Sequence, residues 1–350
     1  MDQLNVAVIG YGLAGAVFHA PLIAAEPRMR VAAVVTGSAE RAAQAEAEHP
    51  GVRVLPDADA LFESADGRID LVVVAAPNDA HAPLTRSALA AGLPVVIDKP
   101  ATPTAAETRE LIALADRAGL ALSVFQNRRW DGDFLTARKL IEQGDLGDVA
   151  RFESRFERWR PVPKGGWRET GGRDQAAGLL FDLGSHLVDQ ALTLFGPAVS
   201  VYAQLDARRP GIDTDDDAFV ALTHVSGVRS HLWMSAVTAQ LGPRMRVLGS
   251  KGAYVKYGLD VQEDALRTGA RPGDAAWGED AEAAWGTVGT DESPRKVETE
   301  HGAYEAYYAG MAAAILDGAP VPVDPRESAS ALDILEAARW SAEQNTVVLL

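Results

Sequence analysis

The fold of this chain is decided by the stretch Asn5-Val6-Ala7-Val8-Ile9-Gly10-Tyr11-Gly12-Leu13-Ala14-Gly15-Ala16-Val17-Phe18-His19-Ala20. Its first part, Val6 to Ile9, is a short apolar run of the kind found in strands buried on both faces. Three glycines follow in the spacing G-x-G-x-x-G, and an Ala-rich stretch of helical character comes next. A strand, this glycine spacing and a helix together predict a dinucleotide-binding turn.

Each glycine of the turn has a physical task. Gly10 allows the tight turn from strand to helix, Gly12 lets a pyrophosphate approach the backbone, and Gly15 lets the helix pack close to the strand. The amides at the start of the helix then face the phosphates. We expect Leu13, which lies inside the turn, to contact the cofactor as well.

The composition narrows the class of protein. A chain of 350 residues with 47% hydrophobic residues predicts a globular protein of about two domains. A net charge of −16 disfavours nucleic acids and anionic membranes as partners. The absence of cysteine excludes disulfides, thiolate metal sites and cysteine nucleophiles. There is no apolar run near the length of a membrane span and no signal-peptide pattern, so we expect a cytoplasmic protein.

Strands and helices alternate six times up to residue 125, which predicts a doubly wound parallel sheet with helices on both faces. We therefore assign residues 1–125 to a dinucleotide-binding Rossmann domain. After this point the pattern changes to runs of short strands, which predict an open, mostly antiparallel sheet. We assign residues 126–350 to an α+β domain for substrate binding and oligomerisation, with 179–195 as one helix and 260–299 as an irregular excursion that is a candidate lid.

The end of the second strand bears on cofactor preference. An NAD enzyme usually has Asp or Glu there to hold the ribose 2′-hydroxyl, whereas this chain has Thr36, Gly37 and Ser38, with Arg41 one turn further. Thr36 and Ser38 can hydrogen-bond a 2′-phosphate and Arg41 can pair with it, so we expect a preference for NADP, with NAD as an alternative. In the competing interpretation, Arg41 is a solvated helix residue and Glu40 serves the ribose.

Two further strands end in polar residues at the edge where cofactors bind in such sheets. Pro77, Asn78 and His81 follow the fourth strand, where Asn78 either contacts the cofactor or caps a helix, and His81 contacts it or is structural. Lys99, followed by the stiffening Pro100, ends the fifth strand. A lysine there lies near the nicotinamide and can stabilise a developing alkoxide.

Three polar residues, Asp182, His186 and Asp189, recur at i, i+4 and i+7 on one face of the expected helix 179–195. Asp and His at this spacing can bind a metal, although no third or fourth ligand is evident and cysteine is absent. Alternatively His186 is a general base, and Asp182 orients the substrate or the imidazole. We favour the second interpretation and expect no metal.

These motifs resemble those of the Gfo/Idh/MocA oxidoreductase family over nearly the whole chain. The family's Glu-Lys-Pro appears as Asp98-Lys99-Pro100, and its Asp-x-x-x-His appears as Asp182 and His186. The stretches Phe18-His19-Ala20-Pro21, Asn127-Arg128-Arg129-Trp130-Asp131 and Asp182-Leu183-Gly184-Ser185-His186 are similar to a branch of NADP-dependent scyllo-inositol and related sugar dehydrogenases.

The resemblance implies a hydride-transferring dehydrogenase that acts on a secondary alcohol of a cyclic polyol or sugar. Lys99, Asp182 and His186 would be catalytic, and Arg128, Arg129, Trp130 and Asp189 would line the substrate pocket or pack at a domain boundary. A reductase of a keto or imino compound and a non-catalytic dinucleotide-binding regulator are the alternatives. Relatives commonly pair the open sheet face, which implies a homodimer or homotetramer.

Overall fold

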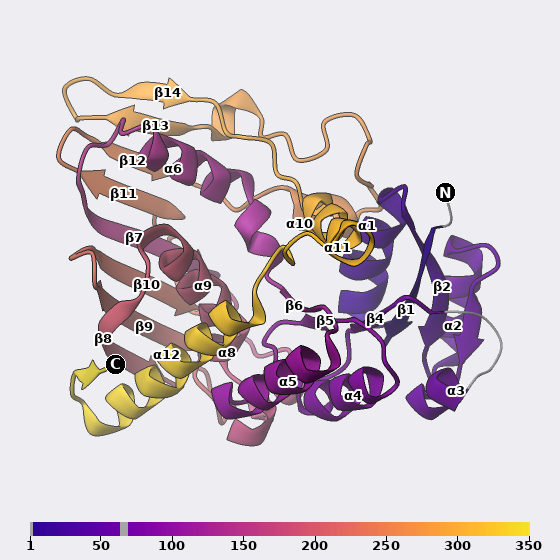
Figure 1. The fold of residues 1–350 in the computed structure, drawn as a ribbon. Coiled ribbons are helices and arrows are strands. Elements are labelled where there is room, and N and C mark those ends of the chain that lie inside the picture. The colour runs from indigo at the N-terminus through magenta and orange to yellow at the C-terminus, as the bar shows by residue number, and fades with distance from the viewer. Residues whose placement is uncertain (1–2, 64–68) are drawn as a thin grey trace. The chain divides into compact units, whose positions relative to one another are not determined.

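The computed structural model of the protein describes residues 3–63 and 69–350, and Figure 1 shows its ribbon. The chain folds into two compact units. The first unit comprises residues 1–127, 262–277 and 303–329, and the second comprises 128–261, 278–302 and 330–350. No helix within the described ranges is long and apolar enough to cross a membrane.

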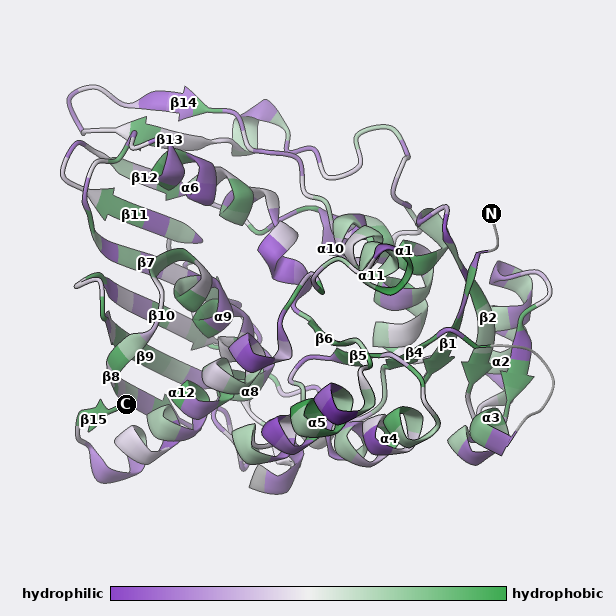
Figure 2. Ribbon diagram, viewed as in Figure 1, coloured by the Kyte–Doolittle hydropathy of each residue, from purple (hydrophilic) through white to green (hydrophobic). Residues whose placement is uncertain are grey.

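The first unit is built on a six-stranded sheet in the order β3-β2-β1-β4-β5-β6, with every pair parallel. The predicted doubly wound sheet is therefore confirmed. β4 is apolar along its length and buried on both faces, as are the first three residues of β5, and the central strands of this sheet are green in Figure 2. The strands are β1 (Leu4–Ile9), β2 (Met29–Val35), β3 (Arg53–Leu55), β4 (Leu71–Val74), β5 (Val95–Asp98) and β6 (Leu122–Phe125).

Local capping sets the helix ends in this unit. Ser38 and Thr104 each accept a hydrogen bond from a backbone N–H in the first turn of the following helix, and Gly119 ends a helix in the left-handed conformation. The first helix opens with a π-helical turn, η1 (Ala14–His19), before it becomes α-helical. The other helices of the first unit are α1 (Ala20–Ala25), α2 (Ala39–Glu48), α3 (Ala58–Glu63), α4 (Asn78–Ala90), α5 (Ala105–Ala118), α10 (Gln262–Arg267) and α11 (Glu305–Asp317).

The second unit carries a nine-stranded sheet in the order β14-β13-β12-β11-β7-β10-β9-β8-β15. It is mostly antiparallel, as expected, but β7 and β10 are parallel neighbours. Helices α7 to α9 and the strands β8 and β9 lie between them in the chain, which gives the long crossover that a parallel pair requires. The strands are β7 (Val149–Glu157), β8 (Ala198–Asp206), β9 (Asp217–His224), β10 (Arg229–Ser235), β11 (Met245–Gly249), β12 (Ala253–Lys256), β13 (Gly286–Gly289), β14 (Arg295–Val297) and β15 (Val348–Leu349).

The single helix expected over 179–195 is wrong, because it is broken at Leu183 into two helices. A Cβ added to Gly184 would lie 3.2 Å from Cε of Met234 on β10, so the chain approaches the sheet closely at a residue with little helix preference. The remaining helices are η2 (Asn127–Trp130), α6 (Gly132–Glu142), α7 (Trp167–Thr170), η3 (Arg173–Gln175), α8 (Leu179–Asp182), α9 (Gly184–Phe195), η4 (Glu282–Ala284) and α12 (Pro325–Gln344).

The expectation of an irregular excursion over 260–299 is also wrong. This stretch begins with α10 and later supplies β13 and β14, which extend the nine-stranded sheet beyond β12. Both strands are short, and β13 begins and ends with glycine, so they leave little periodicity in the sequence. The indole N–H of Trp285 donates to the Asp280 carbonyl at 3.1 Å, a bond that closes the chain segment directly before β13.

Candidate active site

The glycine turn of the first unit has the geometry that its sequence predicts. Gly10 follows β1 with a φ of 94°, and a Cβ on Gly10 would overlap the carbonyl oxygen of Ala75. A Cβ on Gly15 would likewise overlap the carbonyl oxygen of Gly10. Gly12 is different, because a Cβ there would meet only the guanidinium of Arg41, at 3.7 Å. Backbone packing therefore requires glycine at positions 10 and 15. At Gly12 no other backbone among the described residues lies close to the position of a Cβ, so this side of the turn is open.

The end of β2 brings the residues expected to select the cofactor close to this turn. The Thr36 side chain accepts a hydrogen bond from the Ser38 N–H at 3.3 Å, and the Ser38 side chain accepts one from the Arg41 N–H at 3.4 Å. Ser38 thereby caps α2, and its hydroxyl has a structural as well as a recognition role. The Arg41 side chain extends back to Gly12, so a cation lies beside the open side of the turn.

The turn after β4 holds Pro77 at the N-cap of α4 and a buried Asn78 in its first turn. The ring of His81 is almost fully buried, and its two nitrogens each lie 2.9 Å from a backbone carbonyl oxygen, one of Pro100 and one of Ala76. His81 thus links the turn after β4 to the turn after β5. These contacts favour a role for His81 in holding the two turns together.

Lys99 directly follows β5 and precedes a cis peptide to Pro100. The carboxylate of Asp98 accepts a hydrogen bond from the Lys99 N–H at 2.8 Å and lies 3.8 Å from Nε2 of the buried His19. Burial alone would raise the pKa of Asp98, but His19, with smaller contributions from His81 and Lys99, holds that pKa below its usual range. Asp98, which stands where the motif usually has glutamate, is therefore an ionised carboxylate that hydrogen-bonds the backbone of the turn carrying Lys99.

In the second unit, the helix break separates two of the predicted catalytic residues. Asp182 ends α8 and is partly exposed, whereas His186 lies in the first turn of α9 and is buried. The three polar residues expected on one continuous face therefore belong to two helices. Asp182 Oδ1 lies 3.5 Å from Nε of Arg168, a partner that the sequence does not indicate because the two residues belong to different helices, α7 and α8.

Arg128, Arg129, Trp130 and Asp189 lie in the second unit around η2 and α9. Arg129 donates two hydrogen bonds to the carboxylate of the buried Asp189, at 2.8 and 2.6 Å. Arg128 is buried with its guanidinium 4.7 Å from the ring centre of Phe156, and Trp130 is half-buried. The structure thus ties η2 to α9, one turn beyond His186, through an ion pair whose members lie 60 residues apart.

A buried network of polar side chains around Arg244 lies next to η2 and α9, and the sequence did not predict it. Arg244 donates to the side chains of Ser154, at 2.5 Å, and Gln190, at 3.1 Å, and its Nε lies 3.2 Å from the carboxylate of Asp133. Gln190 in turn donates to the Arg128 carbonyl at 2.8 Å. The only sequence signal was the unusual density of arginine and aspartate between residues 128 and 133.

Asp131 is the most perturbed carboxyl group of this network. Burial raises its pKa most strongly, Arg128 opposes that effect, and the neighbouring carboxylates of Asp260 and Asp133 add to it, giving a pKa of about 8. The backbone N–H of Gly132 donates to Asp260 at 2.7 Å, so Asp260 is also held at the start of α6.

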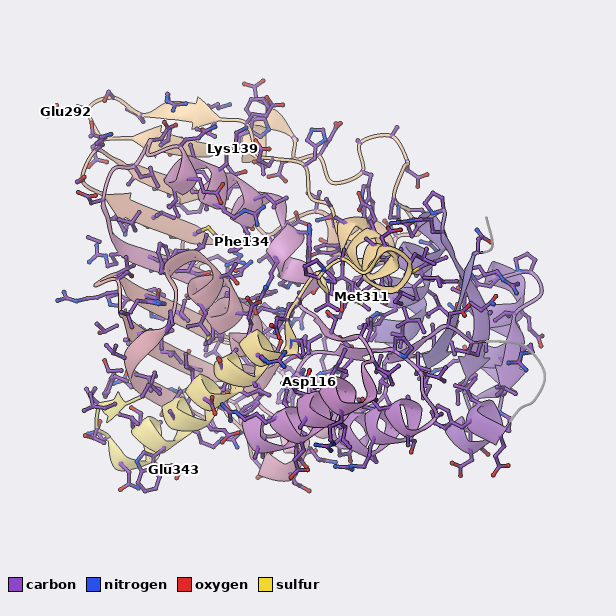
Figure 3. The ribbon with its side chains drawn as sticks, in the orientation of Figure 1. Asp116, Phe134, Lys139, Glu292, Met311 and Glu343 are labelled. Carbon is purple, nitrogen blue, oxygen red and sulfur yellow. The ribbon has the colours of Figure 1, made fainter. Side chains whose placement is uncertain are left out.

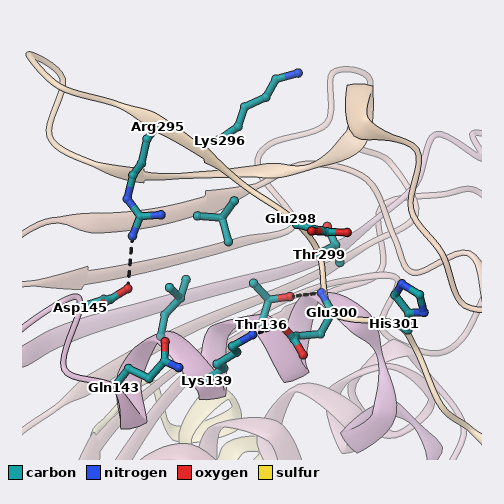
Figure 4. A pocket seen from close by; sticks show the side chains of 12 residues that line it. Thr136, Lys139, Gln143, Asp145, Arg295, Lys296, Glu298, Thr299, Glu300 and His301 are labelled. Atoms are coloured by element: carbon teal, nitrogen blue, oxygen red, sulfur yellow. Dashed lines mark hydrogen bonds and ion pairs between the residues drawn. The ribbon is translucent and has the colours of Figure 1, made fainter.

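A separate hollow of about 580 Å³ lies between α6 and β14 and contains none of the predicted site residues (Figure 4). Lys139, on α6 with the buried Phe134 (Figure 3), pairs with Glu300, while Arg295 pairs with Asp145 at 3.2 Å. These cations are neutralised by the acids of the same hollow, so it has no net attraction for an anionic cofactor.

Comparison with known proteins agrees with the fold and with the motifs. Residues 4–126 match the NAD-binding Rossmann fold of the Gfo/Idh/MocA oxidoreductase family, and residues 138–350 match the family's C-terminal alpha/beta domain. The chain is 42% identical to the oxidoreductase YdgJ of Escherichia coli, covering 100% of this chain and 99% of YdgJ.

Two further similarities cover the whole chain. It is 36% identical to IolW of Bacillus subtilis, an NADP-dependent scyllo-inositol 2-dehydrogenase, with 100% of this chain and 97% of IolW covered. The solved structure of the Bacillus subtilis oxidoreductase YvaA superposes with a TM-score of 0.92 at 34% identity, over 100% of both chains. With both family models matched in order along its length, this chain belongs to the Gfo/Idh/MocA family of oxidoreductases.

Proposed function

We propose that the protein is an NADP-preferring dehydrogenase that oxidises a secondary alcohol of a cyclic polyol or sugar. The observation that carries the proposal is that Asp182 and a buried His186 lie on either side of the break between α8 and α9. An acid and an imidazole so placed suit proton removal from a substrate hydroxyl. The similarity to IolW, an NADP-dependent scyllo-inositol 2-dehydrogenase, supports the choice of a polyol.

The first unit fits a dinucleotide. Side chains at Gly10 and Gly15 would overlap backbone, so the turn has the close packing that brings a helix N-terminus up to a pyrophosphate. Gly12 would present its backbone to the phosphates. Leu13, Pro77 and Asn78 are our proposed contacts along the rest of the cofactor.

Preference for NADP is supported by charge at the end of β2. Arg41 reaches Gly12, and Thr36 and Ser38 stand where an NAD enzyme usually has an acid. A guanidinium can pair with a 2′-phosphate, and two hydroxyls can donate to it. The nearest acid of α2, Glu40, is exposed in the first turn of that helix.

Each catalytic residue has one task in the proposed reaction. Bound NADP supplies the acceptor for the hydride that leaves the substrate carbon. His186 takes the proton of the substrate hydroxyl, Lys99 donates hydrogen bonds to the oxygen as it gains negative charge, and Asp182 orients the substrate. The substrate loses a hydride and a proton and becomes a ketone, so the electrons balance.

A direct test measures NADPH formation by absorbance with a panel of inositols, hexoses and pentoses. Oxidation of a cyclic polyol or sugar supports the proposal. Binding of NADP without turnover of any substrate would favour a regulator, and reduction of keto or imino compounds alone would favour a different reductase.

We also propose that the second unit pairs with a second copy through its sheet. In the second unit, α9 packs on β7 and β10, and side chains that alternate with the buried ones point to the opposite face. That face carries a half-exposed aromatic cluster of Phe219, His231 and Trp233, with Arg155 stacked 4.0 Å from the Trp233 ring. A broad aromatic face on a sheet is typical of an interface between subunits.

The oligomer is tested by light scattering after gel filtration. We expect the wild type to elute as a dimer or tetramer, and Trp233→Glu to shift it toward the monomer, because a charge would be buried in the interface. Trp340→Glu, at an exposed tryptophan of α12, is the matched control. A monomeric wild type would contradict the proposal.

A further inference from the structure

We propose that Arg168 is a substrate-binding residue which, together with Asp182, selects a neutral substrate with neighbouring hydroxyl groups over an acidic one. The inference rests on the proposed function and adds a specificity determinant to it. Arg168 lies in α7, within the loop 165–178, and its Nε is 3.5 Å from Asp182 Oδ1. More than half of the Arg168 side chain is exposed (56%), so a substrate beside Asp182 has access to it.

The backbone that carries Arg168 is held firmly on the second unit. The Arg168 carbonyl accepts hydrogen bonds from the Gly178 N–H at 3.1 Å and from the Thr214 hydroxyl at 3.4 Å. The next carbonyl, that of Glu169, accepts from the Asp213 N–H at 3.3 Å. Because this backbone is already fixed, a ligand that binds the guanidinium has to order only the Arg168 side chain.

A buried ion pair anchors the same loop through its side chains. Arg209 is buried, and its NH1 lies 2.9 Å from the Glu169 carboxylate while its Nε donates to Asp216 at 2.7 Å. The Glu169 carboxylate also accepts from the Gly165 N–H at 2.7 Å. The Glu169 carboxylate therefore binds within the loop and to Arg209, whereas the side chain of the adjacent Arg168 lies beside Asp182.

The charges of the pair indicate the class of substrate. Arg168 and Asp182 sum to zero, so a carboxylate attracted by the arginine is repelled by the aspartate. A hydroxyl group can accept from the guanidinium or donate to the carboxylate. Two neighbouring hydroxyls of one polyol can do both at once. The pair therefore favours a neutral vicinal diol, such as part of an inositol ring, over a sugar acid.

The test compares the steady-state kinetics of wild type, Arg168→Gln and Arg168→Lys with scyllo-inositol, gluconate and NADP. Loss of a hydrogen bond to a charged group should raise the KM for scyllo-inositol about 10- to 100-fold in Arg168→Gln, with a smaller change in kcat and an unchanged KM for NADP. Arg168→Lys should recover part of the loss because it keeps the charge. Lys164→Gln, at an exposed cation four residues earlier, is the matched control and should leave every parameter unchanged.

Three results would overturn the inference. If the wild type oxidises scyllo-inositol and Arg168→Gln has the same KM, Arg168 does not bind substrate, although the proposed function stands. If gluconate is the better substrate and depends on Arg168, the residue binds a carboxylate. If the wild type oxidises no polyol or sugar, the proposed function fails, and the role of Arg168 fails with it.

Discussion

Arg129 donates two hydrogen bonds to the carboxylate of Asp189, at 2.8 and 2.6 Å, and both side chains are largely buried. Asp189 lies on α9 three residues after His186, so this ion pair fixes the helix that carries the proposed base. Breaking a buried pair by removing one partner leaves an uncompensated charge. The orientation of α9 therefore depends on a residue that lies 60 positions before Asp189 in the chain.

We expect Asp189→Asn to lower the free energy of unfolding by about 3–5 kcal/mol, since Arg129 would remain buried without its full partner. Chemical denaturation monitored by tryptophan fluorescence measures the change. The matched control is Glu142→Gln, which removes an exposed i,i+4 pair with Arg138 and should cost less than about 0.5 kcal/mol. Equal effects of the two substitutions would show that the Arg129–Asp189 pair contributes no more than a surface contact.

A second prediction concerns the cofactor. Arg41→Ala should raise the KM for NADP with little change in kcat, because a contact to the 2′-phosphate is the same in ground and transition states. Ser38 caps α2, so alanine there would disturb the helix as well as the cofactor. Ser38→Asp is the sharper change, since it keeps a capping oxygen and repels the phosphate.

Kinetics with NADP and NAD measure this preference. We expect Ser38→Asp to lower kcat/KM for NADP while that for NAD is kept, and Arg53→Ala, on the neighbouring β3, to serve as the control. A wild type that prefers NAD, with neither substitution altering the ratio, would contradict the NADP assignment.

A third prediction follows from the raised pKa of Asp131, about 8. An aspartate in the unfolded chain loses its proton near pH 4, whereas the folded protein retains this proton up to about pH 8. Between these values the unfolded state binds fewer protons, so the contribution of Asp131 makes stability fall as pH rises through this window and level off above it.

The expected result is that Asp131→Asn reduces the loss of stability between pH 5 and pH 8. Urea midpoints at pH 5, 6.5 and 8 measure it, and Asp291→Asn, at an exposed turn, should leave the wild-type slope unchanged. If Asp131→Asn keeps the full slope, Asp131 is ionised throughout this range.

A fourth prediction concerns metals. Within the ranges that the structure describes, no three His, Asp or Glu side chains form a group suited to a metal ion. Dehydrogenase activity should therefore survive dialysis against EDTA. Loss of activity, followed by recovery with zinc but not with magnesium, would instead make Asp182, His186 and Asp189 candidate ligands.

The parts of the fold that sequence reasoning predicted are those set by local physics. Val72 and Val73 are apolar at consecutive positions, which a strand buried on both faces requires, and Ser38 and Thr104 mark helix starts by side-chain capping. Part of the glycine spacing has a local cause too, because a Cβ on Gly15 would overlap the carbonyl oxygen of Gly10, five residues earlier.

The parts that were missed depend on contacts between distant segments. The helix break at Leu183 reflects the packing of Gly184 against Met234, and the partners of Asp182 and Asp189 come from other elements. Nothing near these residues in the sequence specifies such pairs. Similarly, β13 has only four residues, so its place in the sheet depends on its pairing with β12 rather than on its own pattern.

The last prediction separates the roles of His186 and Lys99. Hydride can leave an alcohol carbon only if the hydroxyl proton also leaves, and a histidine, with an ordinary pKa of about 6.5, can accept that proton near neutral pH. A lysine is normally charged there and is better suited to steadying the oxygen. His186→Ala should lower kcat for oxidation by about 10²–10⁴-fold and remove the acidic limb of the pH profile. Its affinity for NADP should stay near that of the wild type.

Lys99→Ala should also lower kcat but keep the acidic limb, because the base remains. His224→Gln is the matched control, since His224 is a buried histidine whose ring nitrogens lie 2.8 Å from the Gly196 carbonyl and the Ser230 hydroxyl. Its pH profile should be that of the wild type. If the acidic limb survives in His186→Ala and disappears in Lys99→Ala, the lysine is the proton acceptor, and His186 only orients the substrate.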